Sequence, residues 1–178
     1  MKTMKIILAV AGLAGLLYGC ERIRHEGDMT VKMTDAPSSY SEVNVDIQYV
    51  QVHYEDERRG NSGWVDLETK AGIYNLLELQ NNVTVILSDE RKLQAGKITQ
   101  MRLVLGKRNS LVTANVTYAM QVPSGYESGL KLDLHTKVAP GKRTEIVLDF
   151  DADRSVVLEA NGTYSLKPVI TVKSITTY

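Results

Sequence analysis

The chain has 178 residues, with 21 lysines and arginines, 21 aspartates and glutamates, and one cysteine. This length predicts a single domain of ordinary size, and one cysteine excludes an internal disulfide framework. A content of 43% hydrophobic and 24% charged residues excludes a wholly disordered chain, and the zero net charge gives no support to a nucleic-acid partner.

The first twenty residues have the character of a targeting segment. Lys2 and Lys5 precede an uncharged apolar run over residues 6–17, which is too short for a membrane-spanning helix of about 20 residues. Leu17-Tyr18-Gly19-Cys20 then resembles a bacterial lipobox, in which the cysteine is diacylated and becomes the new N-terminus. The alternatives are an ordinary secretory signal followed by a chance cysteine, or a buried structural cysteine.

We therefore predict a lipoprotein signal peptide over residues 1–19, a lipidated Cys20 with a short tether over 20–28, and a single domain over 29–178. Removal of residues 1–19 takes away two lysines and leaves 159 residues with a net charge of −2. Glu21, and not an aspartate, follows the cysteine, which favours an outer-membrane anchor on the periplasmic or the cell-surface side.

The remaining residues predict an all-β fold. Val, Ile, Thr and Tyr make up about 30% of them, a bias typical of pleated, half-buried strands. Over residues 43–54 apolar and polar residues alternate as in a strand. The apolar residues have odd numbers up to Tyr49 and even numbers from Val50 onward, which predicts a β-bulge. A helical turn is expected over residues 74–79, and a second over 88–93.

Further along the chain, alternating apolar runs predict strands over residues 101–105, 130–134, 146–150 and 166–172. Asn161-Gly162 predicts a type I′ hairpin between residues 156–158 and 164–166. We expect an antiparallel β-sandwich, immunoglobulin- or prealbumin-like, with roughly eight to ten strands and at most one or two helical turns. Residues 93–105 and 138–150 share Gly-Lys-x-Thr before alternating apolar positions, which we interpret as one kind of turn used twice.

Seven short motifs occur in order along the chain and begin at Val31, Gly63, Tyr74, Leu93, Ser128, Asp149 and Leu166. Together they resemble the domain of unknown function 4382 family, which is common in Bacteroidetes lipoproteins. The resemblance covers about residues 29–173 and implies an envelope-attached β-sandwich of uncharacterised activity, with no catalytic residues to transfer.

The most suggestive polar cluster is Asp149, Asp151 and Asp153. Carboxylates at alternate positions resemble the start of a calcium loop, but the sixth position is Arg154, where glycine is needed, and the twelfth is Ala160, where glutamate belongs. A solvated strand face, or pairing with a base such as Lys167, is the alternative. Asp35 is similarly interpreted as a turn carboxylate that bonds its own backbone.

Other candidates are few. Trp64 follows a glycine-rich loop and could stack on a sugar, or could be a core or edge tryptophan. His53 and His135 occupy outward strand positions without metal-ligand spacing. We expect no cofactor and no catalysis, because no nucleophile elbow or phosphate loop is present.

These observations favour a non-catalytic, membrane-anchored binding module for a glycan, a surface protein or another envelope partner. The alternative is a fimbria-like structural subunit that assembles by strand addition, and an enzyme is a third, less favoured possibility.

Overall fold

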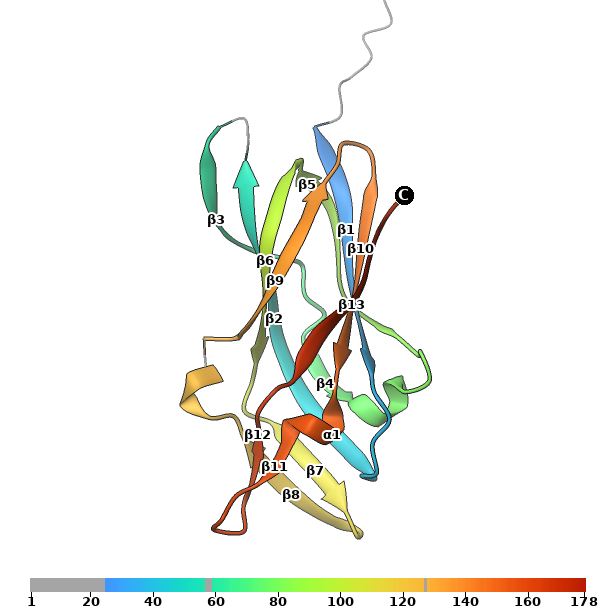
Figure 1. Ribbon diagram of the computed structural model, residues 1–178, viewed down its shortest axis with the longest axis vertical. Helices are drawn as coiled ribbons and strands as arrows, with labels where there is room; N and C mark the ends of the chain where they lie inside the picture. Colours follow the sequence, from blue (N-terminus) through green and yellow to red (C-terminus); the bar gives the residue numbers. More distant parts are fainter. Residues whose placement is uncertain (1–24, 57–58, 127) are drawn as a thin grey trace, which may run out of the picture.

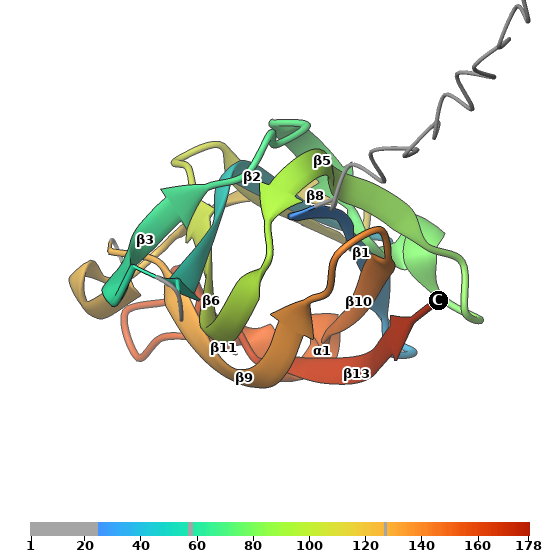
Figure 2. The same ribbon diagram turned by 90° about the horizontal axis from the view of Figure 1, so that it is seen from above.

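The computed structural model describes residues 25–178 except 57, 58 and 127. These residues form two β-sheets packed face to face in a body elongated along the strands (Figures 1 and 2). The first sheet has the strand order β13 (Ile170–Thr177), β10 (Arg143–Phe150), β1 (Glu26–Asp35) and β5 (Val85–Gln94).

The second sheet is larger and is built on the 15-residue strand β2 (Glu42–Asp56), which pairs with β3, β4, β6 and β7. Its main path runs β11 (Val156–Leu158), β12 (Tyr164–Leu166), β8 (Val116–Gln121), β7 (Asn109–Thr113), β2, β6 (Gly96–Leu105) and β9 (Leu130–Val138). Off this path, β3 (Asn61–Asp66) and β4 (Gly72–Asn75) pair with β2.

The predicted all-β sandwich is confirmed, but its sheets are mixed. The pairs β1–β10 and β8–β12 are parallel, whereas purely antiparallel pairing was expected. The strands of each pair are far apart in the chain, so no tight hairpin imposes their relative direction. The described residues form 13 strands and not the predicted eight to ten, because short strands such as β4 show no complete alternating pattern in the sequence.

The predicted bulge in the first long strand is confirmed. The register between β2 and β6 shifts between Ile47 and Tyr49, and the buried positions change there from Val45 and Ile47 to Val50 and Val52. Tyr49 itself is exposed. One extra residue thus keeps both halves of β2 facing the first sheet.

The core lies between the inner faces of the two sheets. The first sheet contributes large buried side chains such as Met29, Met33 and Phe150, and the second contributes Met101 and Leu103. Burial of each such side chain stabilises the fold by about 1.5–3 kcal/mol. This shared core makes one packed unit of the two sheets.

The type I′ turn predicted for the β11–β12 hairpin is absent there, and a turn of that geometry occurs in the β7–β8 hairpin. The β11–β12 hairpin forms as predicted, but its loop is a three-residue turn in which only Gly162 has a positive φ, so it is not type I′. The two-residue turn with positive φ at both positions is Ala114-Asn115, between β7 and β8. A type I′ turn requires that backbone geometry, and Ala114 adopts it at a steric cost that glycine would avoid.

The repeated Gly-Lys-x-Thr segments lie at one end of the sandwich, where each carries the chain between the sheets. The amide of Ala95, between β5 and β6, donates to the His25 carbonyl, and Gly141, between β9 and β10, donates to the Glu26 carbonyl. Gly27 lies so close to the Ala139 carbonyl that a Cβ would overlap it. The chain therefore enters the domain between these two turns, and β1 begins at Glu26, three residues before the predicted domain start.

In the part of the chain that the structure describes, helical structure is confined to three single turns: η1 (Leu76–Leu79), η2 (Ser124–Tyr126) and α1 (Ala152–Ser155). The predicted turn at 74–79 thus exists, whereas residues 88–93 lie in strand β5. Among the described residues, no helix has the length and apolar character needed to cross a membrane.

Candidate functional site

The end of the sandwich opposite to the chain's entrance carries an exposed aromatic and aliphatic surface. Tyr118 of β8 lies directly opposite Leu111, a core residue of β7, and therefore points to the inner face of its sheet. The first sheet does not cover this position, and Tyr118 remains 37% exposed. Val116 and Leu158 share the same face and are 46% and 61% exposed.

Two further tyrosines, Tyr164 and Tyr40, complete this surface. The rings of Tyr118 and Tyr164 lie 5.0 Å apart between centroids, tilted by 57°. Burial raises the pKa of the Tyr40 hydroxyl, and electrostatic interaction with Asp153 and Tyr164 raises it further, so Tyr40 lies within electrostatic range of both. Tyr40 and Tyr164 both pack against the core. We call these residues the tyrosine tip: Tyr40, Val116, Tyr118, Leu158 and Tyr164.

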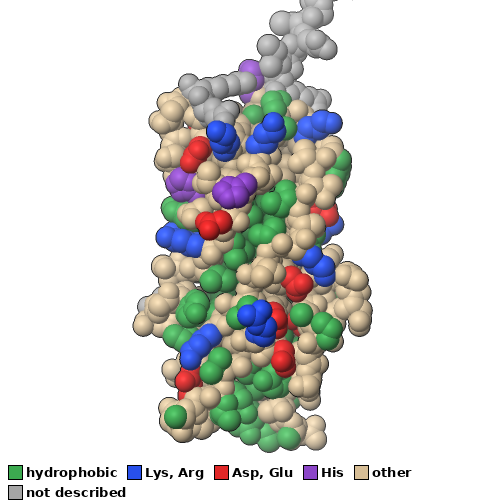
Figure 3. Space-filling view, viewed as in Figure 1, with side chains coloured by type: hydrophobic (Ala, Val, Ile, Leu, Met, Phe, Trp, Pro, Cys, Tyr) green, Lys and Arg blue, Asp and Glu red, His purple; other side chains and the backbone are tan. Residues whose placement is uncertain are grey.

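Figure 3 shows hydrophobic side chains gathered at this lower end of the molecule, where β7, β8 and β11 lie in Figure 1. Tyrosine suits a binding surface because its rigid ring offers apolar area and its hydroxyl a hydrogen bond at low entropic cost. The alternation Val116-Thr117-Tyr118-Ala119-Met120 marks an inward face in the sequence, but it does not reveal where the opposing sheet ends.

Trp64 lies on the outer face of the second sheet, away from the core. On β3 it is opposite His53 of β2, and the two rings meet edge to face with centroids 5.4 Å apart. The guanidinium carbon of Arg102 in β6 lies 4.0 Å from the Trp64 ring centroid, and Lys131 Nζ of β9 lies 5.9 Å from it. We call Trp64, His53, Arg102, Lys131 and Gln51 the tryptophan face.

The structure places the three aspartates that resemble the start of a calcium loop in different local environments. Asp149 is in β10, Asp151 caps the N-terminus of α1 by accepting from the Arg154 amide at 2.9 Å, and Asp153 is exposed on α1. Asp149 is 3.8 Å from Lys173 Nζ. Lys167 pairs with Glu159 and not with an aspartate. No group of three or more His, Cys, Asp or Glu side chains in the described part of the chain is arranged to hold a metal ion.

Asp35 differs from the expected turn carboxylate. It ends β1, is 3% exposed, and accepts a hydrogen bond from the Ala152 amide at 2.9 Å, so it ties the first strand to α1. Burial raises the pKa of Asp35 to about 6, against the lowering effect of the Ala152 and Gln80 hydrogen bonds.

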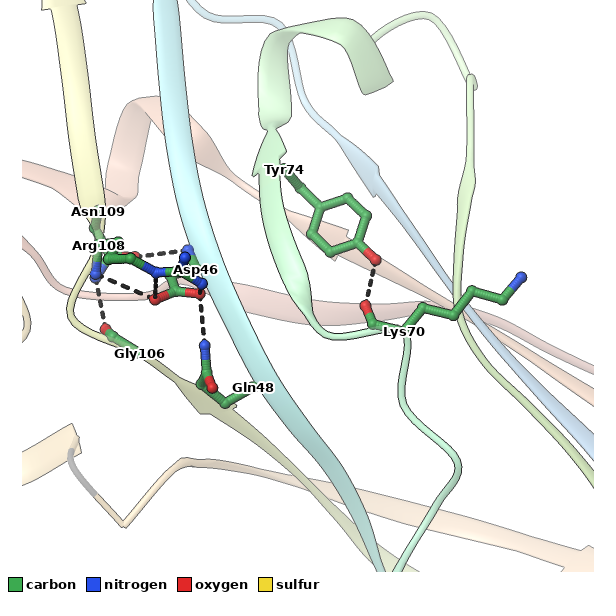
Figure 4. Close-up of polar contacts among 7 residues, drawn as sticks. All are labelled: Asp46, Gln48, Lys70, Tyr74, Gly106, Arg108 and Asn109. Atoms are coloured by element: carbon green, nitrogen blue, oxygen red, sulfur yellow. Dashed lines mark hydrogen bonds and ion pairs between the residues drawn. The ribbon is translucent and has the colours of Figure 1, made fainter.

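A second buried carboxylate, Asp46, joins β2 to the turn between β6 and β7 (Figure 4). Its oxygens accept from the Arg108 guanidinium at 3.0 and 3.1 Å, from the Arg108 amide at 3.2 Å and from Gln48 at 2.6 Å. The Asp46 amide donates to the Asn109 side chain, and its carbonyl accepts from the Gly106 amide. The hydrogen bond from Arg108 is the main reason that the pKa of Asp46 lies below its usual value.

The same close-up shows a separate contact that fixes a nearby loop. The Tyr74 hydroxyl donates to the Lys70 carbonyl, and burial raises the pKa of this tyrosine (Figure 4). Because Tyr74 pairs with Val45 of β2, the contact holds the loop before β4 beside the long strand. We interpret this contact and the Asp46 cluster as structural.

The remaining predicted residues do not converge. His53 bonds Thr99 at 2.9 Å on the tryptophan face, whereas His135 is exposed on β9. Cys20 lies outside the described residues. The sequence did not indicate the tyrosine tip, or the positions of Arg102 and Lys131 beside Trp64, because these arrangements depend on strand pairing.

Fold and surface together define a β-sandwich domain with an exposed aromatic end. The family model described as Domain of unknown function (DUF4382) matches residues 26–168, and the chain belongs to this family. The family resemblance found in the sequence is therefore confirmed. No curated protein and no solved structure matched the chain.

The Asp35 carboxyl predicts a specific pH dependence. Its pKa is higher in the native than in the unfolded state, so its stabilising contribution is complete below pH 3.8 and is lost as the pH rises through about 6. Asp35→Asn retains an oxygen for the Ala152 amide without the charge. We expect this variant to exceed the wild type in unfolding free energy at pH 8 by up to about 3 kcal/mol, and by much less at pH 4.

Urea denaturation of both proteins at the two pH values measures this difference. Asp153→Asn, which removes an exposed carboxylate from the same region, is the matched control and should show little pH-dependent change. If the unfolding free energies of Asp35→Asn and the wild type differed by the same amount at both pH values, the raised pKa of Asp35 would be contradicted.

Proposed function

We propose that this protein is an outer-membrane lipoprotein of the Bacteroidetes type, anchored through diacylated Cys20, and that its β-sandwich is a non-catalytic binding module. The observation that carries the binding role is the tyrosine tip, which exposes Val116 and Leu158 beside the pair of Tyr118 and Tyr164. Surfaces of this composition are typical of protein and glycan recognition.

The location of the tyrosine tip, at the end of the domain away from the expected anchor, supports the same proposal. The chain enters beside the Ala95 and Gly141 turns, and the tyrosine tip lies at the other end of the strands (Figure 1). An extended segment from Cys20 to His25 spans at most about 18 Å. An anchored domain would therefore stay close to the membrane and present the tip to a glycan, a surface protein or another envelope partner.

Strand addition, the function of a fimbria-like subunit, has less support. The outer side of β13 has no strand partner among the described residues, but Lys173 is an extra residue at a register shift in the middle of this edge. Bulges and lysines are both features that discourage pairing with another chain. On the other side of the sheet, β5 is covered by a bridge from Thr69 to Ser88.

The anchor is tested by Cys20→Ser in the full chain. We expect the wild type to incorporate labelled palmitate and to fractionate with the outer membrane, because two acyl chains suffice for stable membrane binding. The variant should lose the label and leave that fraction. A variant that keeps both the label and the membrane location would contradict lipidation at this residue.

The binding role is tested with soluble residues 21–178, which retain the whole core. Glycan arrays and cross-linking to purified envelope proteins should identify a ligand that binds the wild type. The double substitution Tyr118→Ala and Tyr164→Ala should weaken its affinity about tenfold or more, because aromatic anchors dominate such contacts.

Tyr49→Ala is the matched control, since Tyr49 is 55% exposed away from the tip, and this variant should bind like the wild type. Equal binding by the double variant would contradict a role for the tip. Absence of any ligand for the wild type, together with hydrolytic activity, would contradict the binding module itself.

A further inference from the structure

The tryptophan face contains two cations without a carboxylate partner. Arg102 and Lys131 lie opposite each other on β6 and β9, and neither forms an ion pair within the described part of the chain. Among the described residues, the one hydrogen bond of the Arg102 side chain runs from Nη1 to Gln51 Oε1 at 3.3 Å, and the buried Nε has no partner there.

Two aspartates lie on this face, but their carboxylates accept hydrogen bonds from glutamine side chains. Gln51 Nε2 donates to Asp66 at 2.6 Å, and Gln100 Nε2 donates to Asp133 at 2.9 Å. Within the described residues, Arg102 and Lys131 therefore form no direct ion pair with these two aspartates, whose oxygens accept from neutral amides. A half-buried guanidinium without a counterion is unfavourable, and an external anion would relieve this cost.

The position of Arg102 also orients it for recognition. Its guanidinium stacks on Trp64 at 4.0 Å, and Gly129 lies so close to the Arg102 stem that a Cβ there would overlap it. Stacking fixes the plane of the guanidinium, and a fixed planar fork binds a carboxylate better than a mobile ammonium does. Lys131, exposed beside it, adds a second positive charge.

We propose that the tryptophan face binds an acidic saccharide, with its carboxylate held by Arg102 and Lys131. The surrounding amide, imidazole and carboxylate groups offer both donors and acceptors to sugar hydroxyls, and an aromatic side chain adds apolar contact area. An acidic peptide would use the cations but not this arrangement of hydroxyl partners. The site goes beyond the proposed role of the tyrosine tip and lies on a different surface.

The test uses soluble residues 21–178, trigalacturonate and its fully methyl-esterified form. Trp64 is the only tryptophan of the chain, so its fluorescence reports directly on this face. We expect saturable binding of trigalacturonate with a Kd of about 1 mM or lower, and we expect added salt to weaken it. The fully methyl-esterified form should bind at least about tenfold more weakly than the acid.

Two variants separate the roles of the cations. Lys131→Ala removes an exposed side chain and should weaken trigalacturonate binding about threefold to tenfold, and Arg102→Lys, which keeps the charge but loses the fork, should do the same. Lys107→Ala, an exposed lysine on the β6–β7 turn, is the matched control and should leave binding unchanged. Circular dichroism confirms that each variant is folded.

Equal binding of acid and ester, unchanged binding in both variants, or no fluorescence or calorimetric signal up to about 10 mM would overturn the proposal. Equal binding of tetraglutamate would overturn the saccharide assignment. The Tyr118→Ala and Tyr164→Ala double variant should bind trigalacturonate like the wild type, so the result for this face is independent of the result for the tyrosine tip.

Discussion

The arrangement of the second sheet depends on the hydrogen bonds between the Asp46 carboxylate and Arg108. The neighbour of β2 changes at this residue, because residues 42–44 pair with β7 whereas residues 47–55 pair with β6. Asp46 is 2% exposed and fills this junction by accepting from the backbone and side chain of Arg108. A Cβ at Gly106 would overlap the carboxylate, so the turn needs glycine there. Without the arginine, a buried charge would be left unpaired, which is strongly destabilising.

Both candidate surfaces follow from this junction. The bulge between Ile47 and Tyr49 lies directly after Asp46 and turns Gln51 and His53 outward, where they support Trp64 and Arg102. On the other side, the β7–β8 hairpin carries Tyr118 beyond the edge of the first sheet. The molecule thus presents one surface on its side and one at its end, and the same strand holds both.

The sequence predicted local features better than pairings. The parity change in β2, the turn at Leu76–Leu79 and the β11–β12 hairpin were all visible because they depend on neighbouring residues. The parallel β1–β10 pair and the approach of Arg102 to Trp64 were not, since they join segments far apart in the chain. Residues 88–93 were mistaken for a helical turn because their charged residues hide the strand pattern, and pairing with β1 decides their structure.

Hydrogen–deuterium exchange of the Asp46→Asn variant tests most directly whether the Asp46 carboxylate holds the β7–β8 hairpin, which carries Tyr118, in place. The substitution weakens the contact with Arg108 but leaves the core side chains intact. We predict faster amide exchange in β7 and β8, with little change in β1 and β10, because local opening follows the loss of local contacts. Unchanged exchange in β7 and β8, or an equal increase throughout both sheets, would contradict the account.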